Sequence, residues 1–196
     1  MPFKLDPEYD AILKSLFGNR TPPASLPVGD VEARRARMEP AHKSPSPAVI
    51  YAHGGGMILG SVEAYDKVVA AYVARTGVPS LSVDCRLAPE HPHPIPVNDV
   101  YAALNWLVAH SEELGADTSR IGIMGYSAGG GLAVAAALLA RQDDGPRLAK
   151  LILLSPMLDD RTVSADEHLT PFMSWNTTDN ETGWQALLGC SRAERW

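Results

Sequence analysis

The sequence predicts an α/β fold, with a mainly parallel β-sheet flanked by helices. Three observations predict it: short apolar runs, longer helical patterns between those runs, and glycine or proline where one pattern gives way to the next. Strands that alternate with helices pair in parallel, because each helix carries the chain back to the same end of the sheet. We expect those helices to cover both faces of the sheet.

Four apolar runs have the length and composition of buried strands. They are residues 48–52, 78–83, 121–124 and 151–154. Helical patterns separate them at residues 62–76, 96–110 and 130–141. Gly77 ends the first of these helices, and Pro96 begins the second, because proline is tolerated in a first helical turn. Strand and helix therefore alternate from residue 48 to residue 154.

A different pattern precedes the first strand. Residues 8–17 carry apolar side chains at a helical period, and residues 31–38 form a charged helical run for which Asp30 is a candidate N-cap. The proline-rich residues 40–47 have the composition of a linker. We expect two helices and a linker here, outside the alternating core.

The pattern after Pro156 is irregular. Residues 175–179 predict no regular element, and residues 182–188 predict one short helix. Four strands form only a small sheet, so we expect an incomplete core with exposed sheet edges.

Composition indicates one globular domain and excludes several partners. The chain has 196 residues, is 45% hydrophobic and 20% charged, and carries a net charge of −6. This net negative charge argues against nucleic acid as a partner, because the phosphate backbone is also negatively charged. No apolar run approaches the roughly 20 residues that span a bilayer, and the first residues lack the apolar core of a signal peptide. Cys85 and Cys190 have neither metal-site nor disulfide spacing. We expect a cytoplasmic protein with no metal, no cofactor and no transmembrane segment, and the oligomeric state stays open.

The strongest functional signal is the segment Gly125-Tyr126-Ser127-Ala128-Gly129. It lies where an apolar strand gives way to an alanine-rich helix. A sharp strand-to-helix turn can expose a serine hydroxyl, and the helix N-terminus favours negative charge beside it. The sequence therefore predicts Ser127 as a nucleophile, with the N–H of Ala128 free because helix-initial N–H groups have no partner within the helix.

A second signal is His53-Gly54-Gly55-Gly56, which follows the first core strand. Consecutive glycines let backbone N–H groups converge on an anionic oxygen. A glycine turn without a ligand is the less favoured alternative because Ser127 follows downstream, and a phosphate loop is weaker still because no lysine with Ser or Thr follows. His53 is a candidate general base, but a structural tie between the loop and neighbouring backbone is favoured.

Three segments together resemble the hormone-sensitive-lipase-like branch of the α/β-hydrolase esterases. They are residues 53–56, residues 84–90 (DCRLAPE) and residues 125–130 (GYSAGG), in that order along the chain. The resemblance implies that N–H groups of Gly55, Gly56 and Ala128 form an oxyanion hole, supported by His53 and Gly54. It also implies a short or medium acyl ester as the small-molecule partner, and residues 1–40 as an N-terminal helical cap segment before a partial α/β-hydrolase core, residues 41–196.

The chain departs from the family pattern at one position beside the nucleophile. Tyr126 stands where the family has an aspartate, which puts the local packing in question. The segment 86–90 is expected to anchor its loop through charged hydrogen bonds rather than to bind substrate.

A serine hydrolase also needs a base and a carboxylate, which α/β-hydrolases supply after the serine in the order acid, then histidine. His168 is the one histidine after Ser127 and is preceded by Asp159, Asp160 and Asp166. We expect His168 to lie on a surface loop, and the family's acid and histidine to be absent together with its first and last strands.

Two main functions remain open at this point. The first is a carboxylic-ester hydrolase that is impaired by loss of the triad acid and histidine. The second is a non-catalytic remnant or ligand-binding module of the same fold. A nucleotide-binding α/β protein is a weaker third, because the chain has no phosphate-loop lysine.

Overall fold

The computed structural model describes residues 33–35, 45–162, 164–166 and 168–189, the first three as backbone only. Its centre is a five-stranded sheet in the order β1-β3-β2-β4-β5. The strands are β1 (Ala33–Arg35), β2 (Ser46–Ala52), β3 (Ser80–Val83), β4 (Ala116–Tyr126) and β5 (Lys150–Leu154). β2 pairs in parallel with β3 and β4, and β5 pairs in parallel with β4. The predicted parallel core is confirmed.

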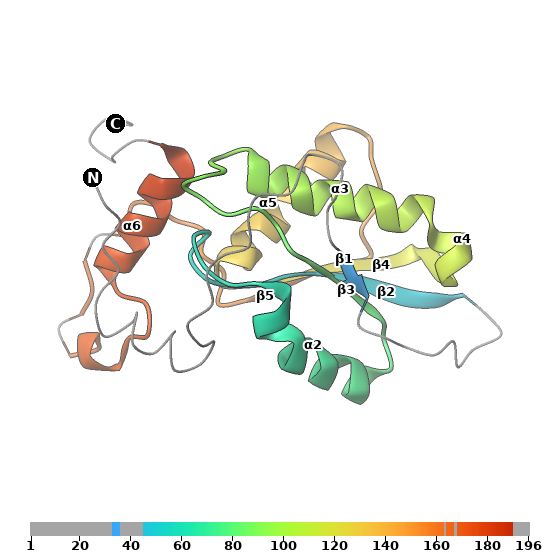
Figure 1. Ribbon diagram of the computed structural model, residues 1–196, viewed down its shortest axis with the longest axis horizontal. Coiled ribbons are helices and arrows are strands. Elements are labelled where there is room, and N and C mark those ends of the chain that lie inside the picture. The colour runs from blue at the N-terminus through green and yellow to red at the C-terminus, as the bar shows by residue number, and fades with distance from the viewer. Residues whose placement is uncertain (1–32, 36–44, 163, 167, 190–196) are drawn as a thin grey trace.

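Helices cover both faces of this sheet, as Figure 1 shows. α2 (Val62–Thr76) lies on one face, and α3 (Ile95–Ala109) and α5 (Ala128–Gln142) lie together on the other. The short α4 (Ser111–Leu114) follows α3 and leads into β4. These helices match their predicted positions within one or two residues, α4 excepted, which the sequence pattern did not indicate.

The core forms between the central strands and the α3–α5 layer. Ile50 of β2 lies beside Leu81 of β3 and Ile123 of β4 in the sheet register. Ile50 and Ile123 have no exposed surface, and neither have Leu104 of α3 and Ala136 of α5. Burial of apolar side chains such as these supplies the main driving force for folding, at about 25 cal/mol per Å² of apolar surface removed from water.

Local signals set the ends of α2. The Ser61 hydroxyl accepts a hydrogen bond from the Ala64 N–H (3.2 Å), and the Asp84 carboxylate accepts one from the Val62 N–H (3.1 Å). Both satisfy N–H groups that the first helical turn leaves unpaired. Gly77 ends the helix with φ 69°, as predicted from its position.

Two predictions of local structure are wrong. Residues 31–38 were expected to be helical, but residues 33–35 form β1, which pairs antiparallel with β3. The open edge of β3 offers backbone hydrogen bonds that a sequence period cannot reveal. Residues 175–179 were expected to be irregular, but α6 (Thr177–Leu188) begins among them. The predicted helix 8–17 lies outside the described residues.

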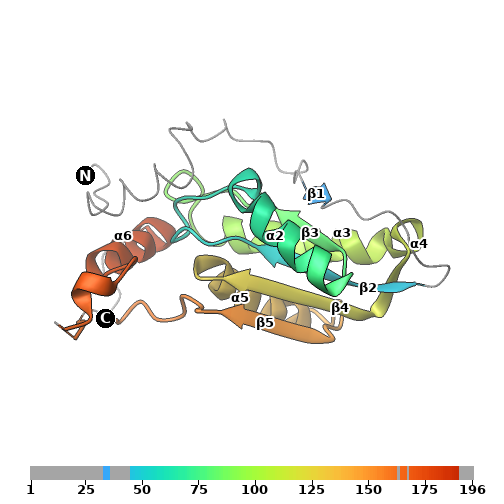
Figure 2. The same cartoon turned by 90° about the horizontal axis from the view of Figure 1, so that it is seen from below.

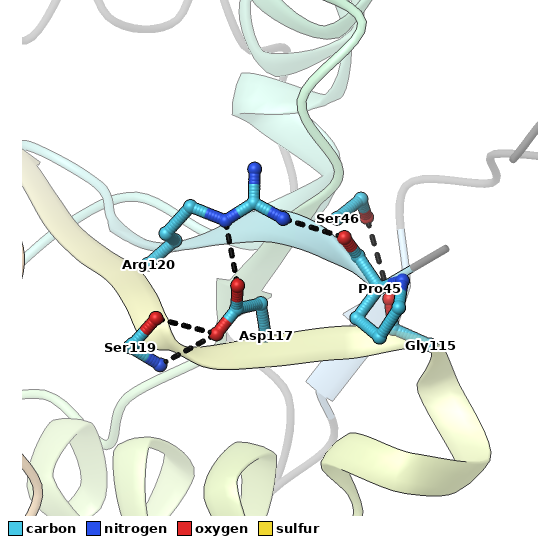
Figure 3. A network of polar contacts seen from close by, with 6 residues as sticks. All are labelled: Pro45, Ser46, Gly115, Asp117, Ser119 and Arg120. Carbon is cyan, nitrogen blue, oxygen red and sulfur yellow. Dashed lines mark hydrogen bonds and ion pairs between the residues drawn. The ribbon is translucent and has the colours of Figure 1, made fainter.

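β4 is also longer than predicted, because polar residues extend it toward its N-terminus. The Asp117 carboxylate accepts hydrogen bonds from Ser119 (2.6 Å) and from Arg120 Nε (2.7 Å), and Arg120 also donates to the carbonyl of Pro45 (2.6 Å), as Figure 3 shows. The hydrogen bonds from Ser119 and Arg120 to its carboxylate lower the pKa of Asp117 to about 2. The network ties the start of β4 to the start of β2.

The two edges of the sheet differ. β1 covers the outer edge of β3. Within the described part of the chain no strand pairs with the outer edge of β5, where Leu151 is 42% and Ile152 is 38% exposed. None of the helices in the described ranges combines the length and apolar character needed to cross a bilayer.

Candidate active site

Ser127 occupies a strained turn between β4 and α5. Its φ of 52° and ψ of −118° lie in a region that residues other than glycine rarely adopt. Hydrogen bonds hold this conformation: the Ser127 N–H donates to the carbonyl of Leu154 (2.9 Å), and its carbonyl accepts from the N–H groups of Gly130 and Met157 (2.9 Å each). The predicted strand–turn–helix setting of Ser127 is therefore present.

The glycines around Ser127 are required by close backbone approach. A Cβ on Gly125 would overlap the carbonyl of Gly129, and a Cβ on Gly129 would overlap the carbonyls of Ala52 and His53. Only glycine avoids these overlaps. The first turn of α5 thus lies directly against the C-terminal end of β2, where the glycine loop begins.

The glycine loop is itself tightly folded. Gly55 and Gly56 have φ values of 122° and 62°, which favour glycine, and the carbonyl of Gly55 accepts hydrogen bonds from the N–H groups of Ile58 (3.1 Å) and Leu59 (2.9 Å). Among the described residues, no backbone carbonyl accepts a hydrogen bond from the N–H groups of Gly55, Gly56 or Ala128. Ala128 is the first residue of α5, so its N–H lies at the positive end of the helix dipole.

Tyr126 joins this loop to the Ser127 turn. A Cβ placed on Gly54 would lie 2.8 Å from the ring carbon Cδ1 of Tyr126 and 2.9 Å from the hydroxyl of Tyr65. The rings of Tyr65 and Tyr126 pack at 6.2 Å between centroids, tilted by 50°. Burial raises the pKa of Tyr65 to about 12. Tyr126, at the position where the resemblance implied an aspartate, therefore fits by packing over a glycine that leaves room for its ring.

His53 is buried beneath the loop, with 3% of its surface exposed. Its Nδ1 lies 2.8 Å from the carbonyl oxygen of Gly54, and its Nε2 lies 3.9 Å from Sγ of Cys85. The ring stacks on Tyr65 at 5.7 Å. Burial lowers the pKa of His53, which favours its neutral form.

The segment after β3 is anchored as its sequence predicted. Arg86 donates to the carboxylate of Asp99 in α3 through its backbone N–H (2.9 Å), Nε (3.0 Å) and Nη2 (2.6 Å). Asp99 is buried and Arg86 is partly exposed, so this is a part-buried, bidentate ion pair. The N–H of Ala88 donates to the carbonyl of Met57 (2.9 Å) and ties the segment to the glycine loop. The charged hydrogen bonds expected of the segment 86–90 are thus present at Arg86.

α6 packs against the same loop and was not anticipated there. A Cβ on Gly56 would overlap the ring of Trp175, and a Cβ on Gly183 would lie 2.7 Å from the carbonyl of Gly56. Figure 2 shows α6 beyond the C-terminal ends of β4 and β5. Asn176 and Asp179 form a capping box at the start of α6, and this Asn-x-x-Asp spacing is the signal that could have extended the predicted helix 182–188 back to its true start at Thr177.

The structure brings none of the acid and base candidates onto Ser127. His168 is exposed, and its backbone N–H donates to the Asp166 carboxylate (2.9 Å). Asp159 pairs with Arg161 on the surface (2.9 Å). In the described ranges, no histidine ring hydrogen-bonds to the Ser127 hydroxyl, and no cluster of three potential metal-ligating side chains occurs.

Comparison with known proteins finds a matching family model and several similar proteins that are named as esterases. A family model described as alpha/beta hydrolase fold matches residues 49–196. Carboxylesterase NlhH of Mycobacterium tuberculosis is 38% identical over 165 residues, which cover 78% of this chain and 50% of that protein. Esterase LipI of the same organism is 39% identical over 111 residues, which cover 57% of this chain and 35% of that protein.

A solved structure, Bacterial Heroin Esterase, matches with a TM-score of 0.72 at 32% identity, over 92% of this chain and 60% of that one. The chain spans half or less of the length of the two curated relatives.

Proposed function

The chain belongs to the α/β-hydrolase fold family, and from that membership we propose that it is a carboxylic-ester hydrolase with Ser127 as nucleophile. The observation that carries the proposal is the Ser127 turn, with its φ of 52° between β4 and α5 and the glycine loop packed beside it. Its relatives are named as esterases. We propose short or medium acyl esters as substrates.

The proposed chemistry is acyl transfer through a serine ester. Oγ of Ser127 forms a bond to the acyl carbon, and the carbonyl electron pair moves onto oxygen. The N–H groups of Gly55, Gly56 and Ala128 would stabilise that oxyanion, because preorganised donors act on charge that develops only in the transition state. The oxyanion electron pair then re-forms the carbonyl as the bond from the acyl carbon to the alcohol oxygen breaks, and the alcohol leaves with the proton that Oγ lost. Water attacks the serine ester in the same way, which releases the acid and returns a proton to Oγ.

Activation of the hydroxyl is the weak step. The Oγ proton needs an acceptor, and within the described residues no histidine is bonded to it. An oxyanion hole and binding alone retain catalysis of roughly 10³–10⁴ over water in hydrolases that lack triad members. We therefore expect reactivity at Ser127 with slow turnover. This same observation favours the second candidate, a ligand-binding protein of the same fold.

Labelling with a fluorophosphonate probe, together with hydrolysis of p-nitrophenyl butyrate, tests the proposal. Wild type should be labelled, and Ser127→Ala should lose both labelling and ester hydrolysis. Ser119→Ala is the matched control, because Ser119 lies near the opposite end of the same strand and should leave both signals unchanged.

Circular dichroism of each variant checks that it is folded. Absence of labelling in a folded wild type would contradict a nucleophilic Ser127. Labelling without hydrolysis would favour the binding protein with an exposed serine.

A further inference from the structure

We propose that Cys85 is a positioning residue for the glycine loop: its thiol donates to Nε2 of His53, and His53 in turn fixes the carbonyl of Gly54. The proposal rests on the proposed function only where it treats the N–H of Gly55 as an oxyanion donor. The contacts that support it lie outside the reacting atoms, beneath the loop.

The first step concerns the proton on His53. Its Nδ1 lies 2.8 Å from the carbonyl oxygen of Gly54. A carbonyl oxygen only accepts hydrogen bonds, so Nδ1 must carry the proton. In the neutral imidazole, Nε2 is then an acceptor. Burial of the ring, which lowers the pKa of His53, agrees with that neutral state.

The second step concerns the partner of Nε2. Sγ of Cys85 lies 3.9 Å from it, within the range of a sulfur hydrogen bond. Cys85 is 5% exposed, and burial raises the pKa of its thiol to about 12, so the group keeps its proton at neutral pH. A protonated thiol is a weak donor, which matches an accepting Nε2.

The third step leads from the ring to the loop. The carbonyl of Gly54 and the N–H of Gly55 belong to one planar, trans peptide, so they point in opposite directions. Fixing the carbonyl toward His53 therefore aims the N–H of Gly55 away from the ring. Gly55 has a φ of 122°, which glycine adopts at little cost among many other values. The backbone of Gly55 itself therefore does little to fix the conformation of the loop.

Neighbouring groups limit other arrangements of the ring. A Cβ on Gly60 would lie 2.6 Å from both the Gly54 carbonyl oxygen and Nδ1 of His53, so this side is closed by backbone. Tyr65 stacks on the ring face, with an interplanar angle of 25°. The hydrogen bonds at Nδ1 and Nε2 thus decide the tautomer of a ring that packing already holds in place.

The competing explanation is that Cys85 only fills space in the core. Three substitutions separate the two. Cys85→Ala and Cys85→Val remove the donor, and valine keeps an apolar side chain of similar size. Cys85→Ser keeps a donor and loses apolar character. Packing alone predicts that valine is tolerated better than serine, and a positioning hydrogen bond predicts the reverse.

The test measures the ¹⁵N shifts of the His53 ring, assigned with a His53→Gln variant, and the rate of fluorophosphonate labelling. We expect wild type and Cys85→Ser to show a protonated Nδ1 and a hydrogen-bonded Nε2. In the Ala and Val variants the Nε2 shift should move to that of an unbonded nitrogen, and labelling should slow about two- to tenfold, the effect of losing one neutral hydrogen bond. Cys190→Ala is the thiol control and should match wild type.

Two results would overturn the proposal: a proton on Nε2 in wild type, or an Nε2 shift that Cys85→Ala leaves unchanged. Both of these results are read from the ring ¹⁵N shifts, which do not need a reactive serine. If wild type resists labelling but shows the expected shifts, the proposed function fails and the positioning of the loop stands.

Discussion

Ser127 keeps an unfavourable backbone conformation because glycines two and three residues away allow close packing around its turn. Gly125, Gly129 and Gly130 let α5 approach β2 and Pro156 more closely than any Cβ would permit. Hydrogen bonds from the segment after β5 then hold the turn. Strain of about 1–3 kcal/mol at such a residue persists only when its surroundings determine it fully.

A matched pair of glycine substitutions tests this account. Gly129→Ala should destabilise the fold by more than the roughly 1–3 kcal/mol typical of overpacking, because its Cβ meets backbone oxygens that cannot move aside. Gly122→Ala, in β4, should cost far less, since its Cβ would find its nearest neighbour at 3.5 Å. Urea denaturation of the two variants measures the difference. Similar losses of stability would show that close approach at Gly129 is not what matters.

At the residue scale, the motifs in the sequence locate Ser127, Gly55 and Gly56 without any structure. They do not locate Trp175 or the partner of Cys85. The reason is that the motif residues are adjacent in sequence, whereas Trp175 reaches Gly56 across 119 residues of chain (175 − 56). Such a contact leaves no local pattern.

Among the elements, the core helices follow from apolar period and cap residues, whereas for α6 the apolar period predicts only residues 182–188 and misses the start of the helix at Thr177. Its apolar period is weak, and its start depends on one capping box. The Asn176 side chain accepts from the N–H groups of Thr178 (2.8 Å) and Asp179 (3.0 Å), and Asp179 accepts from the N–H of Asn176 (3.1 Å). This cap matters for the site, because α6 carries Gly183 against the glycine loop.

Removing the cap should therefore weaken α6 measurably. Asn176→Ala is expected to cost about 0.5–2 kcal/mol of stability, whereas Asn176→Ser should retain most of it, because serine is also a good N-cap. Chemical denaturation gives the stability. Equal losses in both variants would mean that the side-chain cap contributes little.

For the molecule as a whole, a buried thiol and two tyrosine hydroxyls make the free energy of unfolding depend on pH in the alkaline range. Burial raises the pKa of Cys85 from 9.0 to about 12, that of Tyr65 from 10.0 to about 12, and that of Tyr51 further. Between those values the unfolded chain has lost protons that the folded protein keeps. The contribution is complete below about pH 9 and is lost as the pH rises through the folded values.

Urea midpoints measured from pH 7 to pH 11 should consequently fall above about pH 9. Cys85→Ala should flatten the fall between pH 9 and pH 10, because that variant has no thiol to ionise. The Tyr65→Phe variant should flatten it only above about pH 10. Parallel curves for all three proteins would contradict this assignment of the groups.

The sequence by itself determined the parallel core, the strand–turn–helix setting of Ser127 and the glycines of the neighbouring loop. These follow from apolar period, from turn chemistry and from residues adjacent in the chain. Only the tertiary structure decided that β1 covers the edge of β3, that α6 and Trp175 close on Gly56, and that Cys85 lies against His53. Each of these depends on a contact between distant segments, whose energy comes from surfaces that exist only after the chain has folded.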